Sequence, residues 1–227
     1  MNRSFVSVIL GGFGGGGGMG VERVPLRSIR RATAREMARS WYEIPHVMHH
    51  DLTDVTELER FRRDHAEEVE AAGGKLTLTV LVINALAGAL RAFPRFNASL
   101  DPDEQTIVLK RYFHVGVAVA TEQGLLVPVV RDADRKSLVE IAAELVELAE
   151  RARAGELERE EMQGGTFTVT NVGGIGGTLF TPIIRHPEAA ILGLGRAELR
   201  PVAAGDPQDP KLSARLILPL ASLEPES

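Results

Sequence analysis

Helical and strand patterns follow one another along this chain without the regular β-α-β alternation that builds a parallel sheet. Helical periodicity occupies residues 54–72 and 76–93, a hairpin pattern follows over 106–130, and strand patterns return over 166–220. Between the hairpin and the later strands, Ser137 opens a long helical segment, with Glu140 completing a capping box. Runs of helices and hairpins in this order predict an α+β fold with a mixed sheet flanked by helices.

Composition excludes several classes of function. The chain has 227 residues, 44% of them hydrophobic and 25% charged, which is ample for a folded core. It contains no cysteine, so it offers no thiol nucleophile, disulfide or cysteine-ligated metal. The net charge of −5 argues against nucleic acid as the main partner. We also find no membrane-length apolar run and no secretory cleavage site, and we expect a cytoplasmic protein that binds neither nucleic acid nor membrane.

The first 20 residues are dominated by glycine. Gly12, Gly14 and Gly17 satisfy the G-x-G-x-x-G pattern of dinucleotide-binding loops, but five consecutive glycines satisfy almost any glycine pattern. The segment that follows, VERVPL, is β-like rather than the start of a helix. The interpretation favoured by composition is a flexible linker or disordered start over residues 1–20. Residues 21–227 are then long enough for one large domain or two small ones.

Arginines recur at every fourth position from the start of the first helical segment, at Arg27, Arg31, Arg35 and Arg39. Like charges at this spacing repel one another in an isolated helix. The stripe is typical of a solvated face, or of one matched by a neighbouring subunit's acidic residues. The alternative is contact with an anionic ligand such as a phosphate, for which Arg31 is the candidate.

Histidines cluster in the segment IPHVMHHDLTD, which is expected to be extended after Pro45. On a strand, His46 and His50 share one face while His49 and Asp51 point to the other. This division of the ligands predicts that no metal is bound there. The other notable histidine, His186, precedes a proline and is typical of a surface turn.

The segment Thr166–Gly177 is the best local candidate for chemistry. Thr166, Thr168 and Thr170 alternate with apolar residues, and the strand runs into a glycine loop. Hydroxyls and free backbone N–H groups gathered in this way suit the stabilisation of a developing oxyanion. The alternative is structural, because threonine favours strands and glycine favours turns.

A series of blocks in order resembles one known family. The blocks are IRRATAREMARSW, IPHVMHHDLTDVTELERFR, FPRFNASL, GVAVATEQGLLVPVVRDAD, GGTFTVTNVGGIGGTLFTPII and PEAAILGLG. Together they are similar to the catalytic domain of the dihydrolipoamide acyltransferases, the E2 components of 2-oxo acid dehydrogenase complexes. The resemblance implies a chloramphenicol-acetyltransferase-like fold, homotrimers that build larger E2 cores, and active sites between subunits.

The same resemblance implies ligands and site residues. Coenzyme A is a substrate, the lipoyl group comes from another domain or chain, no metal takes part, and the partners are a lipoyl-bearing chain and the E1 and E3 components. Thr170 corresponds to the hydroxyl that stabilises the oxyanion, where many members have serine. Asn171, Gly173 and Arg31 are candidates for binding substrate or coenzyme A. The segment around the histidine cluster is most similar to acetyl-transferring members, rather than to succinyl or branched-chain ones.

One element of the family pattern is not found. In the family, the strand matching ARLILPL is followed by one ending in H-R-x-x-D-G, whose histidine is the general base, and then by a closing helix. This sequence has ASLEPES at that place, read as a short acidic tail. We therefore expect a domain lacking its last strand and helix and impaired in catalysis. The alternatives are a non-catalytic core subunit that co-assembles with a full-length E2 chain, and an unrelated module that binds coenzyme A.

Overall fold

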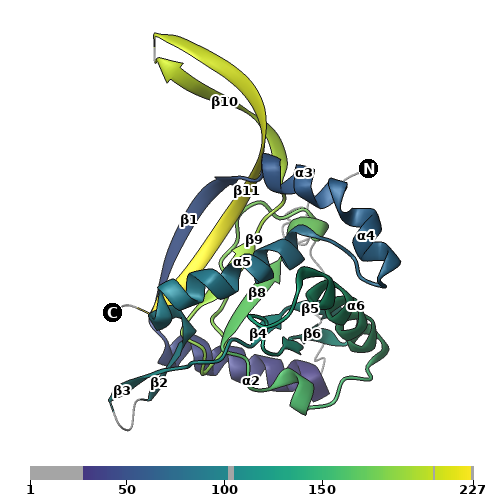
Figure 1. Cartoon of the computed structure of the whole chain (residues 1–227). Coiled ribbons are helices and arrows are strands. Elements are labelled where there is room, and N and C mark those ends of the chain that lie inside the picture. The colour runs from purple at the N-terminus through teal and green to yellow at the C-terminus, as the bar shows by residue number, and fades with distance from the viewer. Residues whose placement is uncertain (1–27, 102–104, 207, 226–227) are drawn as a thin grey trace, which may run out of the picture.

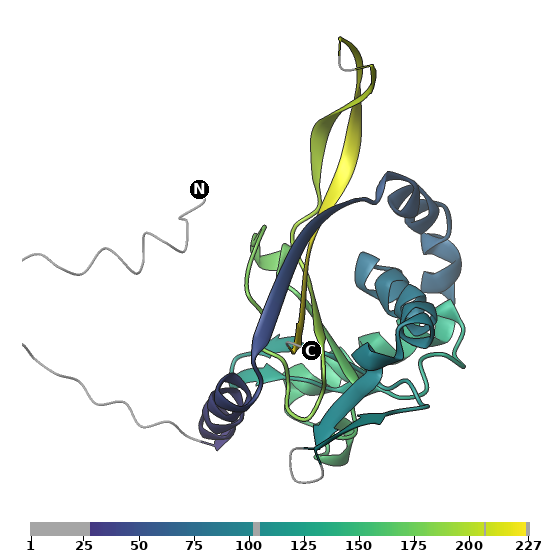
Figure 2. The same cartoon turned by 90° about the vertical axis from the view of Figure 1, so that its left-hand side faces the viewer.

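The computed structural model describes residues 28–101, 105–206 and 208–225. They form a main mixed sheet with helices on both sides and two separate two-stranded sheets, β2-β3 and β5-β6 (Figure 1). Figure 2 shows helices α3 to α6 on one side of the sheet and α2 on the other. The helices are α2 (Ser28–Glu43), α3 (Thr56–Asp64), α4 (Ala66–Ala71), α5 (Leu78–Ala92) and α6 (Leu138–Ala154), with short 3-10 turns at Pro94–Asn97, Glu160–Met162 and Gly173–Ile175. This arrangement confirms the α+β prediction.

The main sheet has seven strands, in the order β1-β11-β9-β8-β4-β7, with β10 pairing to β11. Strand β8 pairs in parallel with both β4 and β9, whereas all other neighbours are antiparallel. The strands are β1 (His46–Asp54), β2 (Ala98–Asp101), β3 (Thr106–Leu109), β4 (Val115–Val117), β5 (Val119–Thr121), β6 (Gly124–Leu126), β7 (Val129–Val130), β8 (Phe167–Asn171), β9 (Ile191–Leu194), β10 (Glu198–Asp206) and β11 (Asp209–Pro225). The central position of β8 places the threonine segment in the middle of the fold.

The core lies between the sheet and helices α5 and α6. Helix α5 begins after Thr77, whose side chain accepts a hydrogen bond from the Val80 amide, and it buries Val80 and Ile83 completely. The helix predicted over residues 76–93 is confirmed. Helix α6 begins with the predicted capping box of Ser137 and Glu140, and buries Ile141 in the same core.

The prediction of one continuous helix over residues 54–72 is wrong. The structure breaks it at His65, whose φ of −110° and ψ of 4° lie outside the helical range. The His65 Nδ1–H donates to the Phe61 carbonyl at 2.9 Å, and the two rings stack with centroids 4.1 Å apart. Phe61 is 41% exposed, while Val55 and Val69 on either side of it are buried.

Strands β10 and β11 form an antiparallel hairpin, and β11 extends well beyond the predicted strand ARLILPL. Its outer half and β10 project beyond the body of the molecule as an arm, residues 198–206 and 208–216 (Figures 1 and 2). Its inner half continues through residues 221–225 and pairs with β1, so the interpretation of that segment as an acidic tail is wrong. The physical reason is alternation: Ala221 and Leu223 are buried on one face, which holds the segment in the sheet.

Two expectations lie outside these residues. The glycine-rich segment 1–20 is not among the residues that the structure describes, so the linker interpretation stays a prediction. The missing last strand and helix concern residues that would follow the printed sequence, and they stay a prediction as well.

Candidate active site

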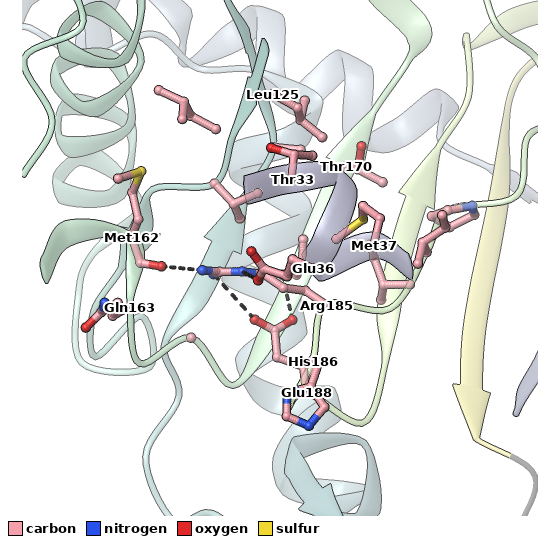
Figure 3. A pocket seen from close by; sticks show the side chains of 18 of the residues that line it. Thr33, Glu36, Met37, Leu125, Met162, Gln163, Thr170, Arg185, His186 and Glu188 are labelled. Atoms are coloured by element: carbon pink, nitrogen blue, oxygen red, sulfur yellow. Dashed lines mark hydrogen bonds and ion pairs between the residues drawn. The ribbon is translucent and has the colours of Figure 1, made fainter. Parts of the chain in front are cut away.

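A pocket of about 750 Å³ lies between helix α2 and the central strands β8 and β9 (Figure 3). Helix α2 supplies one wall through Thr33, Glu36 and Met37, and the segment 180–188 supplies another. Thr168 and Thr170 of β8 form part of its lining. The pocket therefore has a strand of hydroxyl side chains at its base and combines apolar with charged side chains.

The environments differ among three threonines, of which Thr166 precedes β8 and Thr168 and Thr170 lie within it. Thr166 is fully buried, and its hydroxyl contacts the backbone of His114 at 3.2 Å. Thr168 is also buried, and its hydroxyl donates to a Glu188 carboxylate oxygen at 2.6 Å. Thr170 is half-buried and lines the pocket, and its hydroxyl has no hydrogen-bond partner among the described residues. Of the three, Thr170 is the one free to donate to an occupant of the pocket.

Glu188 is a charged residue that the sequence analysis did not single out. It is only 3% exposed, yet it lines the pocket beside Thr168. Burial raises the pKa of its carboxyl to about 7, although the Thr168 hydroxyl and the Arg185 and Lys110 cations pull in the opposite direction. A sequence signal did exist, because Glu188 is the one charge in the apolar run PEAAILGLG.

Arg185 links the walls of the pocket to one another. Its guanidinium lies 3.9 Å from Glu188, donates to Glu36 of α2 at 3.3 Å, and donates to the Met162 carbonyl (Figure 3). The segment containing Arg185 thus ties helix α2 to the sheet through charged groups that are mostly withdrawn from solvent.

His186 and Pro187 form a turn, as predicted, and Pro187 is exposed, but the His186 side chain is half-buried and lines the pocket. Its backbone N–H donates to the Ser40 hydroxyl at 3.1 Å, and its Nε2 lies 3.7 Å from a Glu43 carboxylate oxygen. Burial and the nearby Arg39 cation lower the pKa of the imidazole, against the opposing effect of Glu43. Contacts with α2, which is distant in sequence, place the side chain at the pocket, and the local His-Pro pattern could indicate only the turn.

Asn171 and Gly173 shape the end of β8 and lie outside the pocket lining. The Asn171 amide nitrogen donates to the Thr79 hydroxyl at 2.9 Å, and its Oδ1 accepts from the Gly173 amide at 2.8 Å. A Cβ at Gly173 would lie 2.8 Å from the Gly195 carbonyl oxygen, so the close approach requires glycine. Their placement supports the geometry of the turn, and a direct role in ligand binding stays a prediction.

Arg31 lies on the exposed surface of α2, while its neighbours Ala32 and Thr33 line the pocket. Farther along the arginine stripe, Arg39 forms an ion pair with Glu43 at 2.8 Å, within the same helix. Arg27 lies outside the described residues. Contact of Arg31 with an anionic ligand remains a prediction.

The histidine cluster of β1 is divided as the alternation predicted. His46 contacts the Ile44 carbonyl through Nδ1 and accepts from the Ile184 amide through Nε2, whereas His49 lies 3.6 Å from Glu224. Within the described residues no three His, Asp or Glu side chains are grouped so that they could hold a metal ion. The helices of that same part of the chain are too short or too polar to cross a bilayer.

Comparison with known proteins identifies the family. Residues 19–222 match the family model of the 2-oxoacid dehydrogenases acyltransferase (catalytic domain). The chain belongs to this family. The acyltransferase domain is 46% identical over 201 residues to the dihydrolipoyllysine-residue acetyltransferase component of the pyruvate dehydrogenase complex of Azotobacter vinelandii. That alignment covers 88% of this chain but 31% of the relative, so the chain spans about a third of the relative's length.

Solved structures agree with this assignment. The acyltransferase domain superposes on dihydrolipoamide acetyltransferase of Azotobacter vinelandii with a TM-score of 0.85 and 44% identity, covering 91% of this chain and 83% of that one. That structure comes from an investigation of a serine, a histidine and an asparagine in the catalytic mechanism of the Azotobacter enzyme. Chloramphenicol acetyltransferase matches with a TM-score of 0.51 at 14% identity, covering 88% of this chain and 87% of its own, which confirms the predicted fold alone.

Proposed function

We propose that this domain transfers an acetyl group between dihydrolipoamide and coenzyme A, as part of the E2 component of a pyruvate dehydrogenase complex. The observation that carries the proposal is the Thr170 hydroxyl, which lines the pocket without a protein partner among the described residues. The family membership and the acetyltransferase names of the relatives support the choice of acetyl over succinyl or branched-chain groups.

The proposed chemistry is attack of one thiol on the thioester formed by the other. The thiolate sulfur forms a bond to the carbonyl carbon, and the carbonyl oxygen becomes an oxyanion in the tetrahedral intermediate. Thr170 donates its hydroxyl hydrogen bond to that oxyanion, a contribution of about 10²–10³-fold for one such donor. Collapse of the intermediate expels the other sulfur as a thiolate, which takes up a proton.

The proton-transfer half of this reaction needs a base, because a free thiol with a pKa near 8.5 is mostly protonated at neutral pH. A positioned base typically contributes about 10²–10⁴-fold. None of the six histidines of the printed sequence lies in an H-R-x-x-D-G element. We therefore propose that residues 1–227 by themselves carry the oxyanion half of the site and are impaired in proton transfer.

The substrates and partners follow from the same proposal. Coenzyme A is a substrate, the lipoyl group arrives on another domain or chain, and the reaction uses no metal. One relative of known structure is described as the cubic core of the pyruvate dehydrogenase multienzyme complex. We propose that this chain likewise assembles as a homotrimer or larger core in the cytoplasm, together with E1 and E3.

The second candidate function is a non-catalytic core subunit that co-assembles with a full-length E2 chain. The absence of an H-R-x-x-D-G element from the 227 printed residues favours it. Co-purification with a longer E2 chain, tested with both chains expressed together, separates this function from catalysis by the chain alone.

The decisive experiment measures acetyl transfer from acetyl-CoA to dihydrolipoamide by the purified chain, by Thr170→Ala, and by a chain extended with a family-type H-R-x-x-D-G tail. We expect slow or no turnover without the tail, recovery with it, and loss again in the extended Thr170→Ala variant. Fast turnover by the 227-residue chain would show that another group acts as the base. Extended chains that fold but fail in both forms would refute the proposed function.

A further inference from the structure

We propose that Glu188 is a positioning residue for the site: it holds Thr168, and thereby the Thr170 end of strand β8, at a fixed place relative to helix α2. The inference rests on the proposed function only for its kinetic test. The contacts themselves concern a buried carboxylate that the proposed chemistry does not use.

The contact between Glu188 and Thr168 is the first element of this arrangement. The Thr168 hydroxyl donates to Glu188 Oε2 at 2.6 Å, and both side chains are almost entirely buried. Thr168 and Thr170 are two positions apart on one strand, so their side chains share a face of the sheet. A hydrogen bond to an ionised carboxylate is among the stronger ones in proteins. A change at Glu188 that moves Thr168 should therefore also move Thr170, because the two threonines are only two positions apart on the strand.

Two glycines make room for this pair. A Cβ on Gly165 would lie 2.8 Å from Glu188 Oε1, and a Cβ on Gly116 of strand β4 would lie 2.9 Å from the Thr168 hydroxyl oxygen. Any larger residue at either position would displace one of the two partners. The surrounding backbone is thus shaped around the Thr168–Glu188 contact.

Arg185 extends the arrangement to the opposite wall of the pocket. It lies 3.9 Å from Glu188 and donates to Glu36 of α2, the helix that also presents Thr33 and Met37 to the pocket (Figure 3). Glu188 and Arg185 together connect the strand that carries Thr170 with the helix that faces it. The width of the pocket at Thr170 therefore depends on this connection.

The charged groups around Glu188 come from three places. Arg185 lies in the same loop, the half-buried Lys110 follows β3, and Glu36 comes from α2. The two cations favour the ionised carboxyl, whereas burial and Glu36 favour the protonated one. Loss of the Glu188 charge would remove one of the two counter-charges of Arg185, the other being Glu36, and would weaken the acceptor of the Thr168 hydroxyl.

The test follows the threonine methyl groups of the purified 227-residue chain by NMR between about pH 5 and about pH 9, a range that spans the titration of Glu188. In the unaltered chain, we expect the Thr168 and Thr170 methyl resonances to shift together with one midpoint. In Glu188→Gln, which keeps the shape and an acceptor oxygen, this shared titration should disappear. Thr166→Val is the matched control, because Thr166 is a buried neighbour on the same face that contacts His114 instead. It should leave the Thr170 titration unchanged.

The kinetic arm uses acetyl transfer by the chain carrying the H-R-x-x-D-G tail. Thr168→Val should lower kcat by up to about 10²-fold with little change in KM, since small misplacements of catalytic groups have effects of that size. Thr168→Ser keeps the hydroxyl and should retain most of the rate. A Thr170 resonance that titrates identically in folded Glu188→Gln, or that does not titrate at all, overturns the positioning role. Absence of turnover in every variant counts against the proposed function alone, because the NMR result still decides the role of Glu188.

Discussion

Strand β8 and the arm both consist of strands paired through their backbones. Strand β8 is buried in the protein, whereas the arm is exposed to solvent. Strand β8 has partners on both edges, and Phe167, Thr168 and Val169 are buried in succession. In the arm, β10 and the outer half of β11 pair only with each other, and Leu199 and Leu212 are each 73% exposed. The difference shows that backbone pairing gives a segment its shape, whereas its stability comes from apolar burial.

Strand β11 has a buried inner half and an exposed outer half, so the comparison can be tested by the same substitution in each half. Leu223→Ala removes a completely buried side chain from the inner half and should lower the free energy of unfolding by about 2–5 kcal/mol. Leu212→Ala makes the same change in the arm and should cost about 0.5 kcal/mol or less. Urea unfolding of both variants measures the difference. Equal losses would show that the arm is packed against something in solution.

Thr170→Val tests whether the buried strand carries the chemistry. In the chain carrying the H-R-x-x-D-G tail, it should lower the acetyl-transfer rate by about 10²–10³-fold, since valine has a similar shape but no hydroxyl to donate. Ser213→Ala removes a hydroxyl from the arm and serves as the control, for which we expect no change in rate. A folded Thr170→Val variant with the original rate would mean that the oxyanion is stabilised elsewhere.

Glu188 makes the stability of the interior depend on pH around neutrality. Its pKa is raised to about 7, so the folded chain binds this proton more tightly than the unfolded chain does. The resulting stability is fully present below the ordinary carboxyl pKa of about 4.5 and is lost as the pH rises through about 7. The loss amounts to at most about 3 kcal/mol. Unfolding curves of the wild type and Glu188→Gln should therefore diverge with pH; parallel curves between about pH 5 and about pH 9 would contradict the raised pKa.

The smallest effect is expected at the tip of the arm. Gly205 has a φ of +95°, which alanine adopts only with strain of about 1 kcal/mol. Because the arm can open without the core, Gly205→Ala should accelerate amide hydrogen exchange in β10 and the outer half of β11 only. The midpoint of global unfolding should stay unchanged. A lowered midpoint would indicate that arm and core unfold as one unit.

The predictions from sequence succeeded where the signal was local. Ser137 and Glu140 mark the start of α6 because a capping box depends only on residues within one helical turn. The alternation of threonines with Phe167 and Val169 correctly predicted strand β8, because the two-residue period of a strand is visible within five residues. The resemblance to the acyltransferase family added the larger arrangement and the importance of Thr170.

The features that the sequence did not predict share a physical cause. The contacts that produce them come from distant parts of the chain. Glu188 interacts with groups from β8, α2 and the segment after β3, and its apolar neighbours in sequence could not indicate which groups these are. His186 faces the pocket because Ser40 and Glu43 of α2 hold it there. Residues 221–225 continue β11 because β1, far earlier in the chain, supplies their pairing partner.

That last pairing has a consequence for how the protein is made. His46 lies opposite Pro225, and every pair between β1 and β11 joins residues separated by most of the chain. A ribosome delivers β1 early, so this strand stays without its neighbour until residues 217–225 have left the exit tunnel. Contacts so distant in sequence form slowly, and an unpaired strand edge can associate with other chains in the meantime. Synthesis and chaperone protection during this interval, rather than the stability of the finished sheet, would set the yield of folded protein.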